Sequence, residues 1–299
     1  ADLTDAEQYA PDNDNSDRTK MTKTVAQAML AKVYAEKEVQ DYDKVIAYAD
    51  KVMNTTGVEL EDSYETHWGY DETAKDCMKR NTKEGILEVH WTTGSGNWET
   101  WMYGRQLDNW DYNFTWAKWI TPSRDIINDF DKEGDEVRKN QAIVYYACTW
   151  SNYYPASNYP FMYKLRSSYN NIYWVRLADI ILMKAEAEAY KGNLAESAKL
   201  VNQIRKRAKL KELTSDKTGS KESMIEAVLH ERRLELAFEG ERWFDLCRNN
   251  KVEQYLNGID NRDSGRIRQV KPFDSNSYLL PIPQTALDQN TNLEQNPGY

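Results

Sequence analysis

The sequence predicts a mainly α-helical fold of helix pairs, interrupted by a loop-rich insertion that contains a few short strands. Apolar residues recur at helical spacing over residues 19–56 and again over much of residues 173–248. Residues 177–208 align without gaps on residues 25–56, and a polar turn falls at the same place in both. Repeated helix pairs of about 34 residues stack in this way, so we expect both apolar stripes to face the core.

The expected organisation is a single domain over the whole chain, because 299 residues with 40% hydrophobic content can bury a substantial core. Its four expected parts are a helix pair at 19–56, an aromatic loop-rich insertion at 57–172, a helix pair and a further helix at 173–248, and a C-terminal tail at 249–299.

The first part begins after residues 1–18, which are polar and acidic and predict a loop or a frayed terminus. A helix is expected from Thr19 to about Glu38, and a second from Tyr42 to Met53. The link between them is short, so the two helices should form an antiparallel hairpin.

Within the insertion, residues 84–91 predict a short strand, and Ala142–Tyr146 predicts another. Pro122 lies where a helix can begin, and apolar spacing carries that helix towards Asp135. Residues 150–163 are rich in Tyr, Asn and Pro and predict a loop.

The most regular stretch of the chain, residues 221–248, predicts an amphipathic helix as far as Gly240. Arg232 can pair along its surface with Glu235, three residues away. The run from Glu231 to Arg233 could bind an anion, but an ion-pair network that ties helices together is the expected role. After it, residues 257–276 predict a loop, and Tyr278–Gln284 predicts a short strand closed by prolines.

Charge and composition exclude several classes of function. The net charge of −9 disfavours nucleic-acid binding, which needs clustered Lys and Arg. The three cysteines and three histidines are scattered, so we expect no disulfide framework, no metal site and no cofactor. No run of about 18 apolar residues is present, so we expect no membrane-spanning helix.

Aromatic residues with a polar atom are unusually frequent: the chain has 10 Trp and 20 Tyr but 6 Phe. Six of the Trp fall between residues 91 and 119, among Asn, Asp, Gln and Arg. Aromatic rings can stack on the C–H faces of sugars while polar side chains bind the hydroxyls, so we hypothesise a glycan site. Its predicted residues are Trp98, Trp101, Tyr103, Arg105, Asp108, Asn109, Trp110, Tyr112 and Trp116, flanked by Trp150, Tyr153 and Tyr154.

The alternative for these rings is packing within an insertion that lacks regular structure. We favour packing for Trp91, in the expected strand, and for Trp119, beside the expected helix. Trp174 and Trp243 fall in stretches read as helical, so both are expected to be structural. For the remaining rings of the predicted site, binding and packing stay open.

The sequence also allows two other functions, a glycoside hydrolase and a protein-binding scaffold. Glu99, Asp108 and Asp111 lie among aromatic residues, as the two carboxylates of a glycoside hydrolase would. With 48 acidic residues in the chain such neighbours arise by chance, and no nucleophile-elbow, P-loop or zinc-protease motif is present, so we expect no enzyme. Stacked helix pairs also present concave surfaces to peptides, which leaves a protein-binding scaffold as the alternative.

Residues 231–240 (ERRLELAFEG) and 242–246 (RWFDL) closely resemble the C-terminal signature of the SusD/RagB family. The resemblance extends to residues 176–180 and 278–299, and more weakly back to about residue 19. It implies tetratricopeptide-like helix pairs in a SusD-like domain, with no enzymatic activity. It also implies glycan contacts by aromatic residues that precede the Pro-Ser helix start.

The same resemblance implies a cellular role. Members of this family are lipid-anchored on the extracellular face of the Bacteroidetes outer membrane, where they bind glycan and act as a lid on a SusC-like TonB-dependent transporter. They are longer than this chain and carry a lipidated N-terminal cysteine. The chain is therefore expected to be the C-terminal part of such a lipoprotein, and membrane association is expected through the lipid anchor alone.

Overall fold

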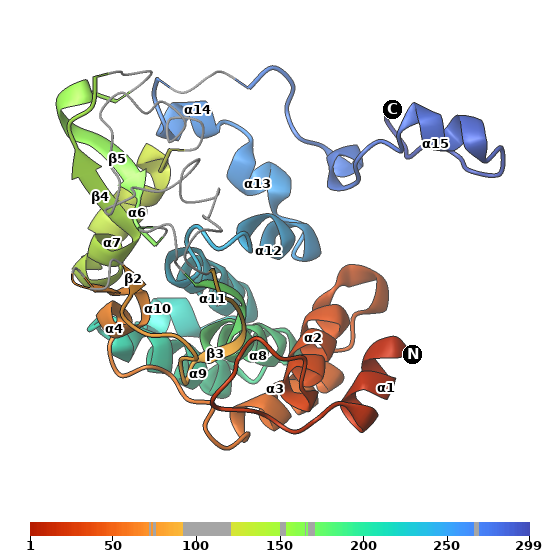
Figure 1. The fold of residues 1–299 in the computed structure, drawn as a ribbon. Helices are drawn as coiled ribbons and strands as arrows, with labels where there is room; N and C mark the ends of the chain where they lie inside the picture. The colour runs from red at the N-terminus through yellow and green to blue at the C-terminus, as the bar shows by residue number, and fades with distance from the viewer. Residues whose placement is uncertain are drawn as a thin grey trace. The chain divides into compact units, whose positions relative to one another are not determined.

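The computed structural model describes residues 1–71, 73, 76–91, 121–149, 154–164, 166, 171–265 and 269–299. The described chain is mainly helical with a few short strands, as the sequence predicts (Figure 1). Contacts divide it into two compact units, residues 1–241 and residues 242–299, and each is described by itself.

Both predicted helix pairs are confirmed. Thr22 caps the first helix, its side chain accepting a hydrogen bond from the backbone N–H of Val25, and Asp41 caps the second in the same way. Gly192 has a φ of +84°, the left-handed conformation that ends the third helix before its partner begins. The pairs are α2 (Lys23–Ala35) with α3 (Tyr42–Met53), and α8 (Leu177–Lys191) with α9 (Leu194–Arg207).

The prediction of a loop for residues 1–18 is wrong in part, because α1 (Asp2–Tyr9) is a helix that packs on α2. None of its residues is fully buried, in keeping with a sequence that has no strong apolar stripe. Polar contacts fix it instead: the carboxylate of Glu7 accepts hydrogen bonds from Lys51 at 2.6 Å and from Gln27 at 3.2 Å. Tertiary contacts thus stabilise a helix that local sequence does not signal.

The helix α11 (Lys221–Glu235) begins at a capping box formed by Ser220 and Ser223 and packs against α8 and α9. It ends five residues before Gly240, the predicted end. The reason lies in the turn that follows, where Phe238 and Gly240 have φ values of +67° and +87° that no α-helix continues through.

Three two-stranded antiparallel sheets complete the described part of the first unit, and β3 and β4 confirm the two predicted strands. The strands β5 and β6 were not predicted. β5 lies within the predicted loop 150–163, and its Tyr159 and Phe161 are buried. The pairs are β1 (Tyr70–Asp71) with β2 (Asp76–Cys77), β3 (Gly85–Val89) with β6 (Ile172–Arg176), and β4 (Ile143–Tyr146) with β5 (Tyr159–Met162).

The helix expected after Pro122 is confirmed as α6, whose cap is Ser123. The main core lies between the helix pairs, α11 and the β3–β6 sheet, where Val25, Ile181 and Val228 are fully or almost fully buried. The other helical segments that the structure describes in this unit are α4 (Tyr64–Trp68), α6 (Arg124–Glu133), α7 (Glu136–Ala142), α10 (Ser215–Thr218), η1 (Lys37–Val39) and η3 (Ala156–Asn158).

The second unit is a series of short helices followed by an extended tail. The predicted strand Tyr278–Gln284 is wrong: residues 279–283 belong to no sheet, and two prolines there lack the N–H that a ladder needs. Side chains hold the tail instead, with Gln295 bonded to both backbone groups of Ile282. The elements are α12 (Arg242–Arg248), α13 (Val252–Leu256), α14 (Ile259–Arg262), η4 (Ser275–Tyr278) and α15 (Gln284–Gln289).

Candidate functional site

Most of the predicted glycan site lies outside the described residues and stays a prediction. Tyr154 is described: its side chain is 9% exposed, its hydroxyl donates to the carbonyl of Pro122 at 2.8 Å, and the guanidinium of Arg124 lies 4.1 Å from its ring centre. A stacking role for Tyr154 also stays a prediction. The predicted residues outside the described ranges are Trp98, Trp101, Tyr103, Arg105, Asp108, Asn109, Trp110, Tyr112, Trp116, Trp150 and Tyr153.

The described residues on either side of segment 92–120 are anchored to two strands. The carbonyl of Trp91 accepts a hydrogen bond from Arg80 at 3.0 Å, and Arg80 also donates to Asn171, the residue before β6, at 2.9 Å. At the other end, the hydroxyl of Thr121 is 3.0 Å from that of Tyr159, the first residue of β5. The described residues that flank segment 92–120 therefore lie close to the starts of β6 and β5.

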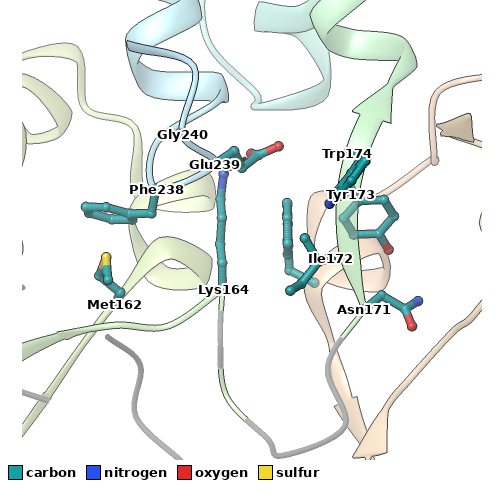
Figure 2. Close-up of a pocket in the computed structure, with 10 residues that line it drawn as sticks. Met162, Lys164, Asn171, Ile172, Tyr173, Trp174, Phe238, Glu239 and Gly240 are labelled. Carbon is teal, nitrogen blue, oxygen red and sulfur yellow. Dashed lines mark hydrogen bonds and ion pairs between the residues drawn. The ribbon is translucent and has the colours of Figure 1, made fainter. Parts of the chain in front are cut away.

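A hollow of about 400 Å³ opens between residues of these same two strands. A volume of this size is typical of small-molecule sites. Figure 2 shows Met162 and Phe238 on one side of Lys164, and Ile172, Tyr173 and Trp174 on the other. The complete lining is Trp68, Met162, Lys164, Asn171, Ile172, Tyr173, Trp174, Phe238, Glu239 and Gly240.

A buried ion pair lies at the centre of the hollow. The ammonium of Lys164 donates to the carboxylate of Glu239 at 2.5 Å and to the backbone carbonyl of Glu235 at 3.0 Å. It also lies 4.6 Å from the ring centre of Trp68. Arg176 donates to both carboxylate oxygens of Glu239, at 2.6 and 2.8 Å. The charges in this region are therefore paired with one another.

The pKa values of this pair follow from burial and from the partners. Burial lowers the pKa of Lys164 to about 8, in spite of the neighbouring carboxylate of Glu239. Burial alone would raise the pKa of Glu239, but Arg176 and Lys164 lower it. Glu239 is thus an anion near neutral pH, which makes it unsuited to donate a proton as a general acid.

Trp174 corrects the expectation of a structural role in a helix. It lies in β6, where the neighbours Tyr173 and Val175 are buried while its own side chain is 62% exposed. Successive residues of a strand face opposite sides, so the burial of Tyr173 and Val175 directs Trp174 outward. The run Ile172–Arg176 shows no alternation of polar and apolar residues, so the local sequence carries no signal that identifies this exposed ring.

Phe238 is held on the other side of the hollow by an unusual backbone. A φ of +67° is rare for a bulky residue and costs on the order of 1–3 kcal/mol. The turn places the next residue, Glu239, inward against Lys164 and Arg176, while Phe238 stays partly exposed. The ion pairs of Glu239 hold the strained turn in place.

The signature run at residues 231–233 forms the predicted ion-pair network between helices. Glu231 accepts from Arg138 at 2.7 Å, and Arg233 donates to Asp125 at 2.8 Å. Arg232 donates at 2.7 Å to Asp179 of α8, a partner on another helix that spacing along α11 does not indicate. These charges are used in packing, which leaves the hollow as the candidate site of the described chain.

Two further findings concern the described residues. They contain no group of three or more His, Cys, Asp or Glu side chains arranged to hold a metal ion. Within the same ranges, no helix combines the length and the apolar character that crossing a membrane requires.

Solved structures resemble this fold over nearly the whole chain. A SusD-like protein from Bacteroides fragilis superposes with a TM-score of 0.75 and 20% identity, covering 100% of this chain and 69% of that one. A SusD-like carbohydrate binding protein from Bacteroides vulgatus superposes with a TM-score of 0.63 and 19% identity, covering 83% of this chain and 50% of that one.

Sequence comparison gives relatives in Formosa agariphila. SusD-like protein P2 is 26% identical over 339 aligned positions, which cover 100% of this chain and 64% of the relative. SusD-like protein P38 is 36% identical over 135 positions, which cover 43% of this chain and 25% of the relative. The chain thus spans less than two thirds of either relative. The sequence model of the SusD family matches residues 83–299, well over half of the chain, and this protein therefore belongs to the SusD family.

Proposed function

We propose that this protein binds oligo- or polysaccharide at segment 92–120 and the adjoining hollow, without chemical conversion. The observation that carries the proposal is the 62% exposed ring of Trp174, on a hollow lined by residues of β5 and β6. The described residues that flank segment 92–120 lie close to the starts of these two strands. Family relatives from Bacteroides vulgatus are described as a SusD-like carbohydrate binding protein and a putative sugar binding protein, which supports the same class of ligand.

The proposed binding surface matches the surface of a sugar. A sugar ring has C–H faces that pack on aromatic rings and hydroxyls that need hydrogen-bond partners. Segment 92–120 supplies Trp and Tyr interleaved with Asn, Asp and Arg, and the hollow supplies apolar walls around a paired charge. One ring contributes about 1 kcal/mol, so several rings must act together for useful affinity.

Removing the rings tests the proposal. In a variant with Trp98, Trp101, Trp110 and Trp116 all replaced by alanine, we expect glycan binding to be lost, whereas single replacements weaken it several-fold. Isothermal titration with a glycan identified on an array measures the affinity, and a thermal melt confirms that the variant is folded. Undiminished affinity of the fourfold variant would remove the site from this segment.

A hydrolase is the competing outcome, and product analysis separates it from a binding protein. Incubation with the bound glycan is expected to release no shorter sugars, in keeping with the ion-paired state of Glu239 in the hollow. Release of reducing ends by purified protein would contradict this part of the proposal.

The cellular part of the proposal is delivery of the glycan to a SusC-like TonB-dependent transporter. The protein would act at the extracellular face of the outer membrane, held there by a lipid anchor. Membership in the SusD family supports this role. Affinity capture of the lipoprotein from detergent-solubilised outer membranes is expected to recover such a transporter, and its absence from the captured material would contradict the partnership.

A further inference from the structure

We propose that the hollow between Phe238 and Trp174 is a subsite for one neutral pyranose ring whose hydroxyls are all equatorial, as in β-linked glucose or xylose. The inference rests on the proposed glycan binding and names the sugar class that the hollow accepts. It uses described residues alone and is independent of segment 92–120.

The walls of the hollow favour a flat ring with two apolar faces. Met162 and Phe238 lie on one side, and Ile172 and Trp174 on the other (Figure 2). A pyranose with equatorial hydroxyls presents axial hydrogens on both faces, so both faces can pack on apolar walls. An axial oxygen, such as the C2 hydroxyl of mannose or the linking oxygen at C4 of β-1,4-linked galactose, lies against one wall, where it loses water without gaining a partner.

The charges of the hollow favour a neutral ligand. Lys164 and Arg176 are already paired with Glu239, and Arg176 also donates to Glu235 at 2.7 Å. A carboxylate or sulfate on the sugar would have to displace a buried carboxylate from its partners, which leaves a buried charge unpaired. Equatorial hydroxyls reach outward in the plane of the ring and can stay hydrated at the open side of the hollow.

The aromatic residues of the two walls differ in exposure and in backbone conformation, so each needs a different substitution. Trp174 is largely exposed, so its replacement by alanine should not unfold the protein. Phe238 has a positive φ that glycine adopts freely, so Phe238→Gly removes the ring and keeps the turn. Tyr9 is an exposed aromatic residue of α1 outside the hollow, and Tyr9→Ala is the matched control.

The experiment is isothermal titration of the protein with five β-1,4-linked tetrasaccharides, of glucose, xylose, galactose, mannose and glucuronic acid. We expect the glucose and xylose forms to bind about tenfold more tightly than the other three. Trp174→Ala and Phe238→Gly are each expected to weaken that binding by about threefold to tenfold, and Tyr9→Ala to leave it unchanged.

Failure of the subsite and failure of the proposed function give different results. If Trp174→Ala and Phe238→Gly bind as the parent does while the fourfold Trp variant does not, the subsite is wrong and glycan binding stands. If the parent prefers the galactose, mannose or glucuronic acid tetrasaccharide, the subsite is likewise wrong and glycan binding stands. If the parent binds none of the tetrasaccharides and no glycan on an array, both the subsite and the proposed function are overturned.

Discussion

Replacing Arg232 by alanine is expected to lower the free energy of unfolding by about 3–5 kcal/mol. Arg232 is fully buried and donates to a carboxylate oxygen of Asp179 at 2.7 Å and to its backbone carbonyl at 3.1 Å. Burial would raise the pKa of Asp179, yet Lys32 and Arg232 hold it well below its ordinary value. Without Arg232, the buried carboxylate of Asp179 keeps its contact with Lys32 but loses its contact with the guanidinium. The ion pair between Arg232 and Asp179, which joins α11 to α8, is then absent.

Urea unfolding followed by circular dichroism measures the loss in the Arg232→Ala variant. Lys199→Ala is the matched control, because Lys199 pairs with Glu196 on the surface of α9 and its side chain is 75% exposed. Such a surface pair is worth about 0–1 kcal/mol. A change for Arg232→Ala no larger than that of the control would contradict a structural role, and the residue would then have to be examined as part of a ligand site.

The helix pairs could be predicted from the sequence because their information is local. In α3, Val45, Ala49 and Val52 recur at helical spacing and Asp41 supplies the cap, so the predicted and observed bounds coincide. The helix α1 could not be predicted, because it depends on contacts made by Glu7 with residues that are 20 and 44 positions away. Apolar periodicity and a capping residue identify a helix whose signals lie within its own sequence. The helix α1 lacks such signals, because contacts with neighbouring elements stabilise it.

The candidate site was harder to predict because its residues come from distant parts of the chain. The hollow joins Trp68 of α4 with β5, β6 and the turn after α11. The strand β6 pairs with β3, so that Ile172 faces Val89 across 83 positions of sequence. A five-residue strand directly before α8 reads as the start of that helix, and this hid the exposed face of Trp174.

The charged residues of the signature illustrate a similar limit. Spacing along the helix offers Glu235 the partner Arg232, but the side chain of Glu235 is fully buried and accepts from Arg138 and Arg176. The composition of the chain gives the number of charged residues, and spacing indicates only partners along the same helix. The arginines that pair with Glu235 come instead from α7 and β6. The expectation of a network was correct because oppositely charged groups that are buried must be paired.

Acidification is expected to destabilise the parent protein through His67 and to spare a His67→Phe variant this loss. His67 is buried in α4, with its ring stacked 4.3 Å from that of Tyr173 and edge-on to that of Trp68. Neither of its ring nitrogens has a hydrogen-bond partner within the described part of the chain. Burial therefore lowers the pKa of His67 from 6.5 to about 4.

The direction of the pH effect follows from proton binding. Between pH 6.5 and 4 the unfolded chain binds a proton at His67 that the folded protein does not, so stability falls as the pH falls through this range. The full loss, reached at about pH 4, is about 3 kcal/mol. Above pH 6.5 the histidine is neutral in both states and contributes no pH dependence.

Urea unfolding of parent and variant at pH 7.5, 6, 5 and 4.5 measures this contribution as the difference between their pH profiles, so that titrating carboxylates common to both cancel. Phenylalanine keeps the stack on Tyr173 and carries no nitrogen that needs a partner, so the stability of the variant should match or exceed that of the parent at pH 7.5.

His230→Phe is the matched control, because the ring nitrogen of His230 lies 3.1 Å from Glu133 and its side chain is 34% exposed. That control is expected to keep the acid-side loss assigned to His67. Parallel profiles for His67→Phe and the parent from pH 7.5 to 4.5 would show that His67 is hydrated or paired in solution and is not the source of the acid sensitivity.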